Sequence, residues 1–178
     1  MQRCHVGGFT LVETLVAMLV LALGVVGAAA TQVSSTRLRA QAALESEAVQ
    51  LAASLGARMR VNAAQMALPD AANPYLNVDY DAAGGEPVAP PVQCFGTADC
   101  DPAQMAAFDL YDTARIVRGA FPGGRIMVCR DGGGASLDWT CAGGSGAPSG
   151  VTLGWRAPAR IGEPAPEATP FVTMVVAG

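Results

Sequence analysis

The N-terminal stretch MQRCHVGGFTLVETLVAMLVLALGVVGAAATQ constrains this chain most, because Glu13 is the only charge between Phe9 and Gln32. A transmembrane helix needs about 20 predominantly apolar residues, so the stretch is long enough to span a bilayer. On insertion scales an acidic residue at mid-bilayer costs roughly 2.5–3.5 kcal/mol. The carboxylate of Glu13 therefore needs a cation that neutralises it.

Three kinds of N-terminal segment have this apolar pattern. A cleaved signal peptide would use Arg3 as its basic end and Ala28-Ala29-Ala30 as its cleavage site. A plain membrane anchor would keep the whole segment. A prepilin-type signal is cut before the apolar run and keeps that run. A lipoprotein signal is excluded, because Cys4 precedes the apolar segment instead of following it.

Glu13 favours the third kind. Cleavage between Gly8 and Phe9 would create an α-amino group one helical turn from the Glu13 carboxylate, and a buried acid is tolerable beside such a cation. The residues GGFTLVE, from Gly7 to Glu13, resemble the class III signal of type IV pilins and type II secretion pseudopilins. The resemblance implies that a membrane-bound prepilin peptidase cuts after Gly8 and methylates the new amine of Phe9. It also implies that Glu13 pairs with a pilin amino terminus during assembly.

The remaining sequence does not indicate an enzyme. Removal of residues 1–8 takes away His5, the only histidine, and with it the usual general base and the commonest metal ligand. The chain has no Walker loop, no dinucleotide-binding glycine motif and no HExxH motif. Its formal charge of -4 does not suggest a nucleic-acid-binding surface. We expect no catalytic site, cofactor, resident metal or nucleic-acid partner.

Four cysteines remain after removal of the leader, and an even number in an extracytoplasmic domain predicts two disulfides. Three pairings are possible. We favour local pairing, Cys94 with Cys100 around a short loop and Cys129 with Cys141 across a hairpin formed by RIMVC and SLDWTC. A zinc site is the alternative, but the spacings are not those of CxxC pairs.

Proline is absent before Pro69, which permits one helix from about Thr10 to about Asn62. Beyond Gln32 the helix becomes amphipathic, and its apolar stripe needs a sheet as partner; a coiled-coil seam is the alternative. The stripe contains Leu44, Ala48, Leu51, Ala52, Leu55 and Met59, with Arg58 and Arg60 off it. We divide the chain into a cleaved leader (1–8), a transmembrane and assembly helix (9–32), its amphipathic continuation (33–62) and a globular pilin domain (63–178).

The globular part is predicted to contain a loop, a helix and strands. Prolines and glycines indicate a loop over 69–91, with Asp79 and Asp81 as solvated acids more readily than as a calcium site. A helix begins with Asp101 as N-cap and Gln104 in a capping box, and ends near Gly119. Its predicted apolar face is Ala103, Ala107, Leu110, Ala114 and Val117. Strands are predicted at about 125–130, 136–141, 150–156 and 170–176, with Trp139 and Trp155 as packing residues.

The order of elements predicts an α+β, pilin-like fold, with a long N-terminal helix packed on a C-terminal antiparallel sheet. The segments RMRVN (58–62) and CFGTADCDPAQMAAFDLYDTARIVRGAFPGG (94–124) resemble the minor pilin family called type IV pilus modification protein PilV. That family often has tryptophan where Tyr111-Asp112 stands here. The resemblance implies a minor pilin that supports piliation and twitching motility or adhesion. Its implied partners are major and minor pilins, prepilin peptidase and the inner-membrane assembly machinery.

The implied location is the inner membrane, with one membrane pass and a periplasmic domain, and then the pilus at the cell surface. Two alternatives remain open at this point. One is a type II secretion pseudopilin, and the other is a membrane-anchored periplasmic binding module whose N-terminus stays uncut.

Overall fold

The computed structural model describes residues 10–130, 137–141, 143–144, 146–157 and 166–177. The chain divides into two compact units, one that ends at Ala43 and one that begins at Leu44. Helix α1 (Leu11–Val61) contributes residues to both units. It ends one residue before the predicted end, and the predicted long helix is confirmed.

The second unit contains the last part of α1, a short helix α2 (Ala63–Met66), helix α3 (Pro102–Ala120) and four strands. The strands are β1 (Val78–Asp81), β2 (Arg125–Arg130), β3 (Ser149–Trp155) and β4 (Thr169–Ala177). They form one antiparallel sheet in the order β1-β2-β3-β4. Three short 3-10 helices complete it: η1 (Asp70–Ala72), η2 (Pro74–Asn77) and η3 (Ala82–Gly84). The predicted α+β, pilin-like architecture is confirmed.

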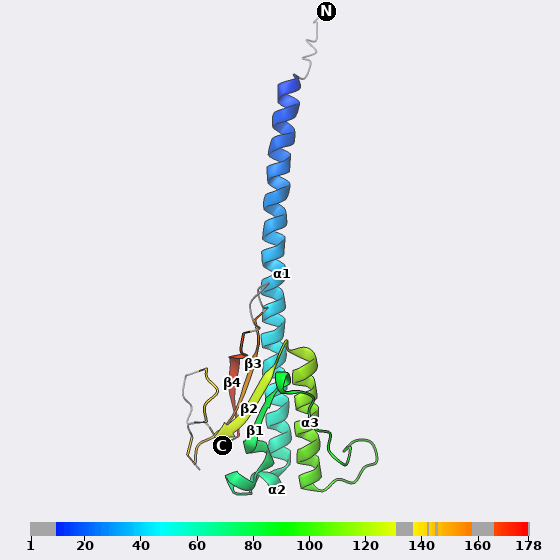
Figure 1. Ribbon diagram of the computed structural model, residues 1–178, viewed down its shortest axis with the longest axis vertical. Helices are drawn as coiled ribbons and strands as arrows, with labels where there is room; N and C mark the ends of the chain where they lie inside the picture. The colour runs from blue at the N-terminus through cyan, green and yellow to red at the C-terminus, as the bar shows by residue number, and fades with distance from the viewer. Residues whose placement is uncertain (1–9, 131–136, 142, 145, 158–165, 178) are drawn as a thin grey trace, which may run out of the picture. The chain divides into compact units, whose positions relative to one another are not determined.

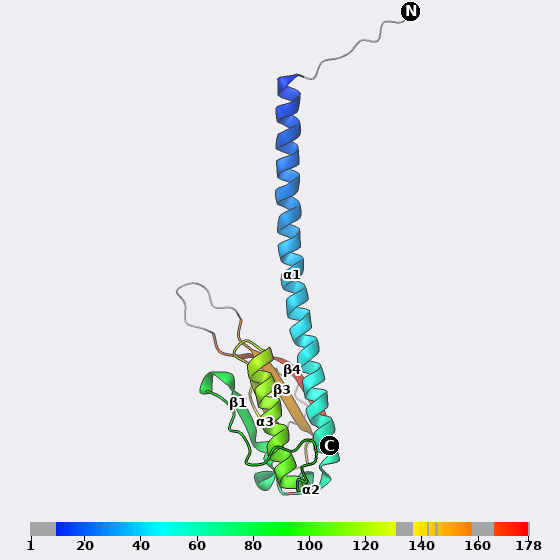
Figure 2. The same ribbon diagram turned by 90° about the vertical axis from the view of Figure 1, so that its right-hand side faces the viewer.

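The core of this unit lies between the helices and one face of the sheet (Figures 1 and 2). The predicted stripe of α1 supplies one wall, since Ala48, Leu51, Ala52, Leu55 and Met59 are buried. Alternate residues of the strands supply the other wall, as the period of two requires. They are Ile126, Val128, Val151, Leu153, Trp155 and Val176.

The predicted capping box of α3 is confirmed. The Asp101 side chain accepts from the Gln104 backbone N–H at 2.8 Å, and the Gln104 side chain accepts from the Asp101 N–H at 3.1 Å. The helix ends at Ala120, one residue beyond the predicted end.

The predicted buried face of α3 is partly wrong. Ala103 and Ala107 are exposed, whereas Ala106, Asp109 and Thr113 are buried together with Ala114 and Val117. The helix is rotated from the apolar face toward Asp109. The reason is that the Asp109 carboxylate has hydrogen-bond donors inside the protein, so the helix can bury a polar side chain there.

Two assignments along the sheet are also wrong. The predicted loop at 69–91 contains β1, so Asp79 and Asp81 lie on a strand. Conversely, 137–141 form no strand; residue 136 lies outside the described residues. The sheet explains both results, because β1 occupies one edge of β2 and β3 occupies the other. No edge of β2 remains for residues 137–141.

Residues 137–141 pack against the sheet face opposite the helical core. Trp139 Nε1 donates to the Ala168 carbonyl at 2.9 Å, and the Arg125 guanidinium lies 4.6 Å from the centre of the Trp139 ring. The Cys141 sulfur lies 3.7 Å from that of Met127, whose side chain is buried. Trp155 packs in the core, stacked between Phe121 and Phe171 at 5.4 and 4.3 Å. Both tryptophans are packing residues, as expected.

Candidate functional site

The predicted processing junction lies at the limit of the described chain. Gly8 and Phe9 fall outside the described residues, as do Arg3, Cys4 and His5. The description begins at Thr10, immediately after the predicted new N-terminus. Cleavage after Gly8 and methylation of Phe9 therefore stay predictions.

Glu13 lies in the first turn of α1, and its side chain is exposed. Its backbone N–H donates to Thr10 Oγ1 at 3.3 Å, and the Thr14 N–H donates to the Thr10 carbonyl at 3.3 Å. Thr10 therefore caps the helix. A carboxylate in this turn is also favoured by the partial positive charge of the helix N-terminus.

The cap was missed by our sequence interpretation, although the sequence contains its signal. Thr10-Leu11-Val12-Glu13 has the Thr-x-x-Glu spacing of a capping box, in which the acid accepts from the backbone N–H of the cap residue. The structure describes one half of such a box, the bond to Thr10 Oγ1. Glu13 thus has two possible roles, helix capping and pairing with an amino terminus, and a test must separate them.

The first part of α1 is long and apolar enough to cross a membrane. Its most apolar 18-residue window has a mean hydropathy of 2.3, and none of that window is buried within the protein. The side chains of Leu11, Val12, Met18, Leu21 and Val26 are all at least two-thirds exposed. A continuous apolar surface of this length needs lipid or other apolar helices as its surroundings.

The end of α1 is held within the second unit by a cluster of polar side chains, which we call the Asp109 cluster: Arg58, Asn62, Tyr75, Asp109 and Asp112. Asp109 accepts from Tyr75 Oη at 2.7 Å and from Arg58 Nη1 at 3.2 Å. Arg58 Nη2 donates to Asp112 at 3.0 Å. Asn62 Nδ2 donates to Tyr75 Oη at 3.2 Å and to the Pro102 carbonyl at 2.8 Å. These bonds join α1 to η2 and α3.

Burial and the adjacent Asp109 carboxylate raise the pKa of Tyr75 well above its ordinary value of 10.0. The hydroxyl therefore stays protonated and donates to Asp109. Arg58 lies off the predicted apolar stripe, and no sequence pattern assigned a role to Asp109. The two side chains come within reach of each other only in the folded chain, so no local sequence signal could have identified the pair.

The four cysteines form the two local disulfides that the sequence favoured, Cys94–Cys100 and Cys129–Cys141. The first closes the loop directly before α3. The second links the end of β2 to the segment that crosses the outer face of the sheet. The second disulfide therefore fixes irregular chain against a strand, whereas the first joins two residues of the same loop.

The acids of β1 pair with arginines. Asp79 accepts two hydrogen bonds from Arg125, both at 2.8 Å, and these raise the pKa of Arg125. Asp81 accepts from Arg156 at 3.0 Å and from the Ala83 N–H at 2.8 Å. Within the described residues, no three His, Cys, Asp or Glu side chains come together as a metal site would require.

Comparison with known proteins bears on the N-terminus. Residues 3–29 match the family model described as the prokaryotic N-terminal methylation motif. The chain carries a prepilin-type signal. Neither curated proteins nor solved structures gave a significant match.

The prepilin-type signal supports a type IV pilin-like protein or a pseudopilin. It implies processing at the membrane and assembly with other pilins and membrane machinery. Together with the apolar first part of α1, it fits a membrane-anchored protein. The match covers the signal and the start of α1, and does not extend to the globular unit.

Proposed function

We propose that this chain is a minor pilin of the type IV pilus, of the kind called type IV pilus modification protein PilV, and that it acts by assembly and not by catalysis. The observation that carries the proposal is the prepilin-type signal, which leads directly into an exposed apolar helix with one acid, Glu13. After processing, the chain would sit in the inner membrane with its globular unit in the periplasm. It would then prime, modify or join the fibre and so support piliation, twitching motility or adhesion.

The Asp109 cluster supports the finer assignment to a PilV-like subunit. The two segments that carry that resemblance, 58–62 and 94–124, are far apart in the sequence. In the structure Arg58 and Asn62 from the first segment bind Asp109 and Pro102 from the second. Residues from both resembling segments are thus bonded to each other at the end of α1, within the globular unit.

The role of Glu13 is tested with two substitutions that separate pairing from capping. Glu13→Gln keeps a side chain that serves in a capping box but removes the charge. Glu13→Val removes both and inserts more easily into a bilayer. If Glu13 pairs with an amino terminus, both variants should be cleaved normally but should fall about tenfold or more in sheared pili, since about 1.4 kcal/mol of lost pairing is a factor of ten.

The measurement is the amount of processed protein in sheared pili relative to the membrane fraction, with the N-terminal mass determined for each variant. If Glu13→Gln assembled like the wild type and Glu13→Val did not, the role of Glu13 would be helix capping alone. Wild-type behaviour of both variants would remove any assembly role for this acid.

Gene deletion then separates the pilin from its nearest alternative. Loss of surface piliation and twitching with intact protein secretion would support the minor pilin. Loss of secretion with intact pili would identify a type II secretion pseudopilin instead. An uncut N-terminus at Met1 would favour a membrane-anchored binding module and contradict both.

A further inference from the structure

A short polar segment follows the apolar part of α1, and we call residues 31–39, TQVSSTRLR, the polar collar. All of its residues except Val33 and Leu38 are polar, and its two charges, Arg37 and Arg39, are both positive. None of its side chains is buried. A positively charged collar therefore stands directly beyond the apolar run of the helix.

The length of the helix places the collar at the height of lipid headgroups. Residues 11–30 span about 30 Å at 1.5 Å per residue, which equals the hydrocarbon thickness of a bilayer. The Cα atoms of Arg37 and Arg39 then lie about 10 and 13 Å beyond the hydrocarbon. Each headgroup layer is roughly 5–8 Å thick. The two backbone positions are thus just outside the headgroups.

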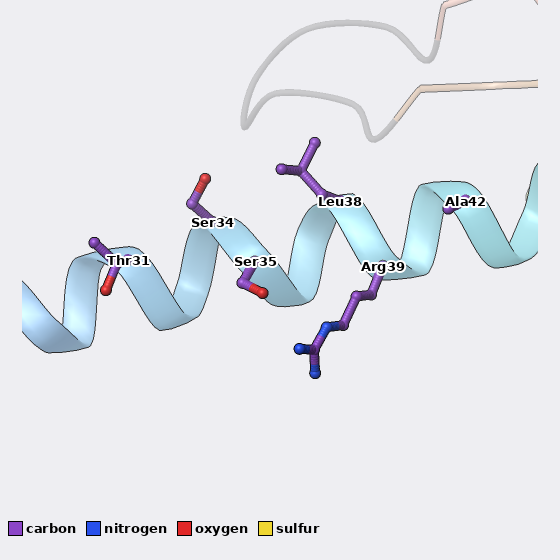
Figure 3. Close-up of a pocket in the computed structure, with 6 residues that line it drawn as sticks. All are labelled: Thr31, Ser34, Ser35, Leu38, Arg39 and Ala42. Atoms are coloured by element: carbon purple, nitrogen blue, oxygen red, sulfur yellow. The ribbon is translucent and has the colours of Figure 1, made fainter.

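The side chains point back toward that layer. Cα–Cβ bonds of an α-helix tilt toward its N-terminus, so a long side chain covers the preceding turn. Figure 3 shows Arg39 in this direction, with its guanidinium group displaced from its own backbone toward the level of Ser35. Thr31, Ser35 and Arg39 follow each other at intervals of four residues and line one side of the pocket drawn there.

The charge of the collar is not satisfied within the described protein. The ion pairs between described residues involve other arginines: Arg58, Arg115, Arg118, Arg125, Arg130 and Arg156. Arg37 and Arg39 form none with the residues that the structure describes. Guanidinium groups bind phosphate through paired hydrogen bonds, and this is the anion found at the height that they reach.

We propose that the polar collar binds the phosphate groups of anionic phospholipids in the leaflet at the C-terminal end of the apolar run. Arg37 and Arg39 contact the phosphates, and their hydroxyl-bearing neighbours keep this part of the helix polar. The inference rests on membrane insertion of α1, which the proposed function requires. It adds a lipid preference that would hold the subunit at a defined depth before assembly.

The test uses the processed full-length chain in nanodiscs of phosphatidylcholine with spin-labelled phosphatidylglycerol or phosphatidylcholine as tracer. A basic residue near an anionic surface contributes about 1 kcal/mol, which corresponds to about fivefold. We therefore expect the wild type to prefer phosphatidylglycerol about fivefold or more. The double variant Arg37→Gln/Arg39→Gln should lose that preference. Arg37→Lys/Arg39→Lys should keep much of it, because the charges remain.

Arg115→Gln is the matched control, since Arg115 lies on α3 and its side chain is 68% exposed. It removes one positive charge away from the collar and should leave the preference unchanged. Equal association of both lipids with inserted wild type would overturn the proposal. If the Arg115→Gln variant lost as much preference as the double variant, the effect would be one of net charge, and the proposal would also be overturned.

Two further arms separate the remaining outcomes. In the first arm, inorganic phosphate is compared with sodium chloride of equal ionic strength. If phosphate alone abolished the preference for phosphatidylglycerol, the collar would be a general anion site, and the lipid assignment would be overturned. Flotation with neutral vesicles measures insertion independently of lipid preference. Failure of the wild type to insert would overturn the membrane anchor and the collar together, whereas insertion without preference would overturn the collar alone.

Discussion

Replacement of Asp109 by alanine should weaken the packing of the end of α1 within the globular unit. The Asp109 side chain is only 7% exposed and accepts from both Tyr75 and Arg58. Its loss leaves the Tyr75 hydroxyl without its acceptor in a buried site. The oxygen of Tyr75 still accepts from Asn62, and Arg58 still pairs with Asp112.

The expected loss of stability follows from these contacts. A hydrogen bond to a charged group contributes about 1.5–3 kcal/mol, and we assign this value to the buried Tyr75 bond. The Arg58 side chain is 34% exposed, so solvent screens its pair and we assign it less than about 1 kcal/mol. The sum is about 1.5–4 kcal/mol. In a chain of this size it corresponds to a fall in Tm of roughly 3–16 °C.

Asp112→Ala is the matched control. Asp112 lies on the same helix and binds the same arginine, but its side chain is 22% exposed and has no bond to Tyr75. The gain in helix propensity from Asp to Ala is similar at both positions and cancels in the comparison. We expect Asp112→Ala to cost about 1 kcal/mol or less, and Asp109→Asn to lie between the two.

The assay is urea unfolding of the processed chain in detergent, followed by tryptophan fluorescence. Trp155 is 2% exposed and stacked in the core, so its emission reports unfolding of the globular unit. Equal losses for Asp109→Ala and Asp112→Ala, within about 0.5 kcal/mol, would refute the reasoning that the buried Tyr75 bond dominates.

Three further predictions concern packing, pH and disulfides. Gly56→Ala should destabilise by about 1–3 kcal/mol in the same unfolding assay, because a Cβ would lie 2.6 Å from Val176 Cβ. Gly119→Ala, with open space around its Cβ, should be neutral or stabilising; similar effects of both would contradict this packing argument. The raised pKa of Tyr75 means that the folded state holds its proton more tightly than the unfolded state. The stability that Tyr75 contributes is therefore complete below pH 10 and falls as the pH rises above it. If a Tyr75→Phe variant lost stability above pH 10 as steeply as the wild type, this assignment would be wrong. Non-reducing peptide mapping should link Cys94 to Cys100 and Cys129 to Cys141, whereas a crossed link between Cys94 and Cys129 would contradict the structure.

The sequence alone determined the elements whose causes are local. The sequence predicted α1 from two local features, the apolar run that contains Glu13 and the absence of proline before Pro69. Both act locally, because helix formation depends on neighbouring residues. The capping box at Asp101 and Gln104 predicted the start of α3 for the same reason. The two disulfides were favoured correctly because each joins cysteines that are close in the chain.

Tertiary structure decided the features that depend on distant partners. Val78–Asp81 form a strand because they pair with one edge of β2. Residues 137–141 form no strand, because β1 and β3 already pair with both edges of β2. The apolar pattern of α3 did not identify its buried face, since bonds from Tyr75 and Arg58 made burial of Asp109 acceptable. Strand pairing and burial of charge depend on groups brought together by folding, and no window of neighbouring residues contains both partners.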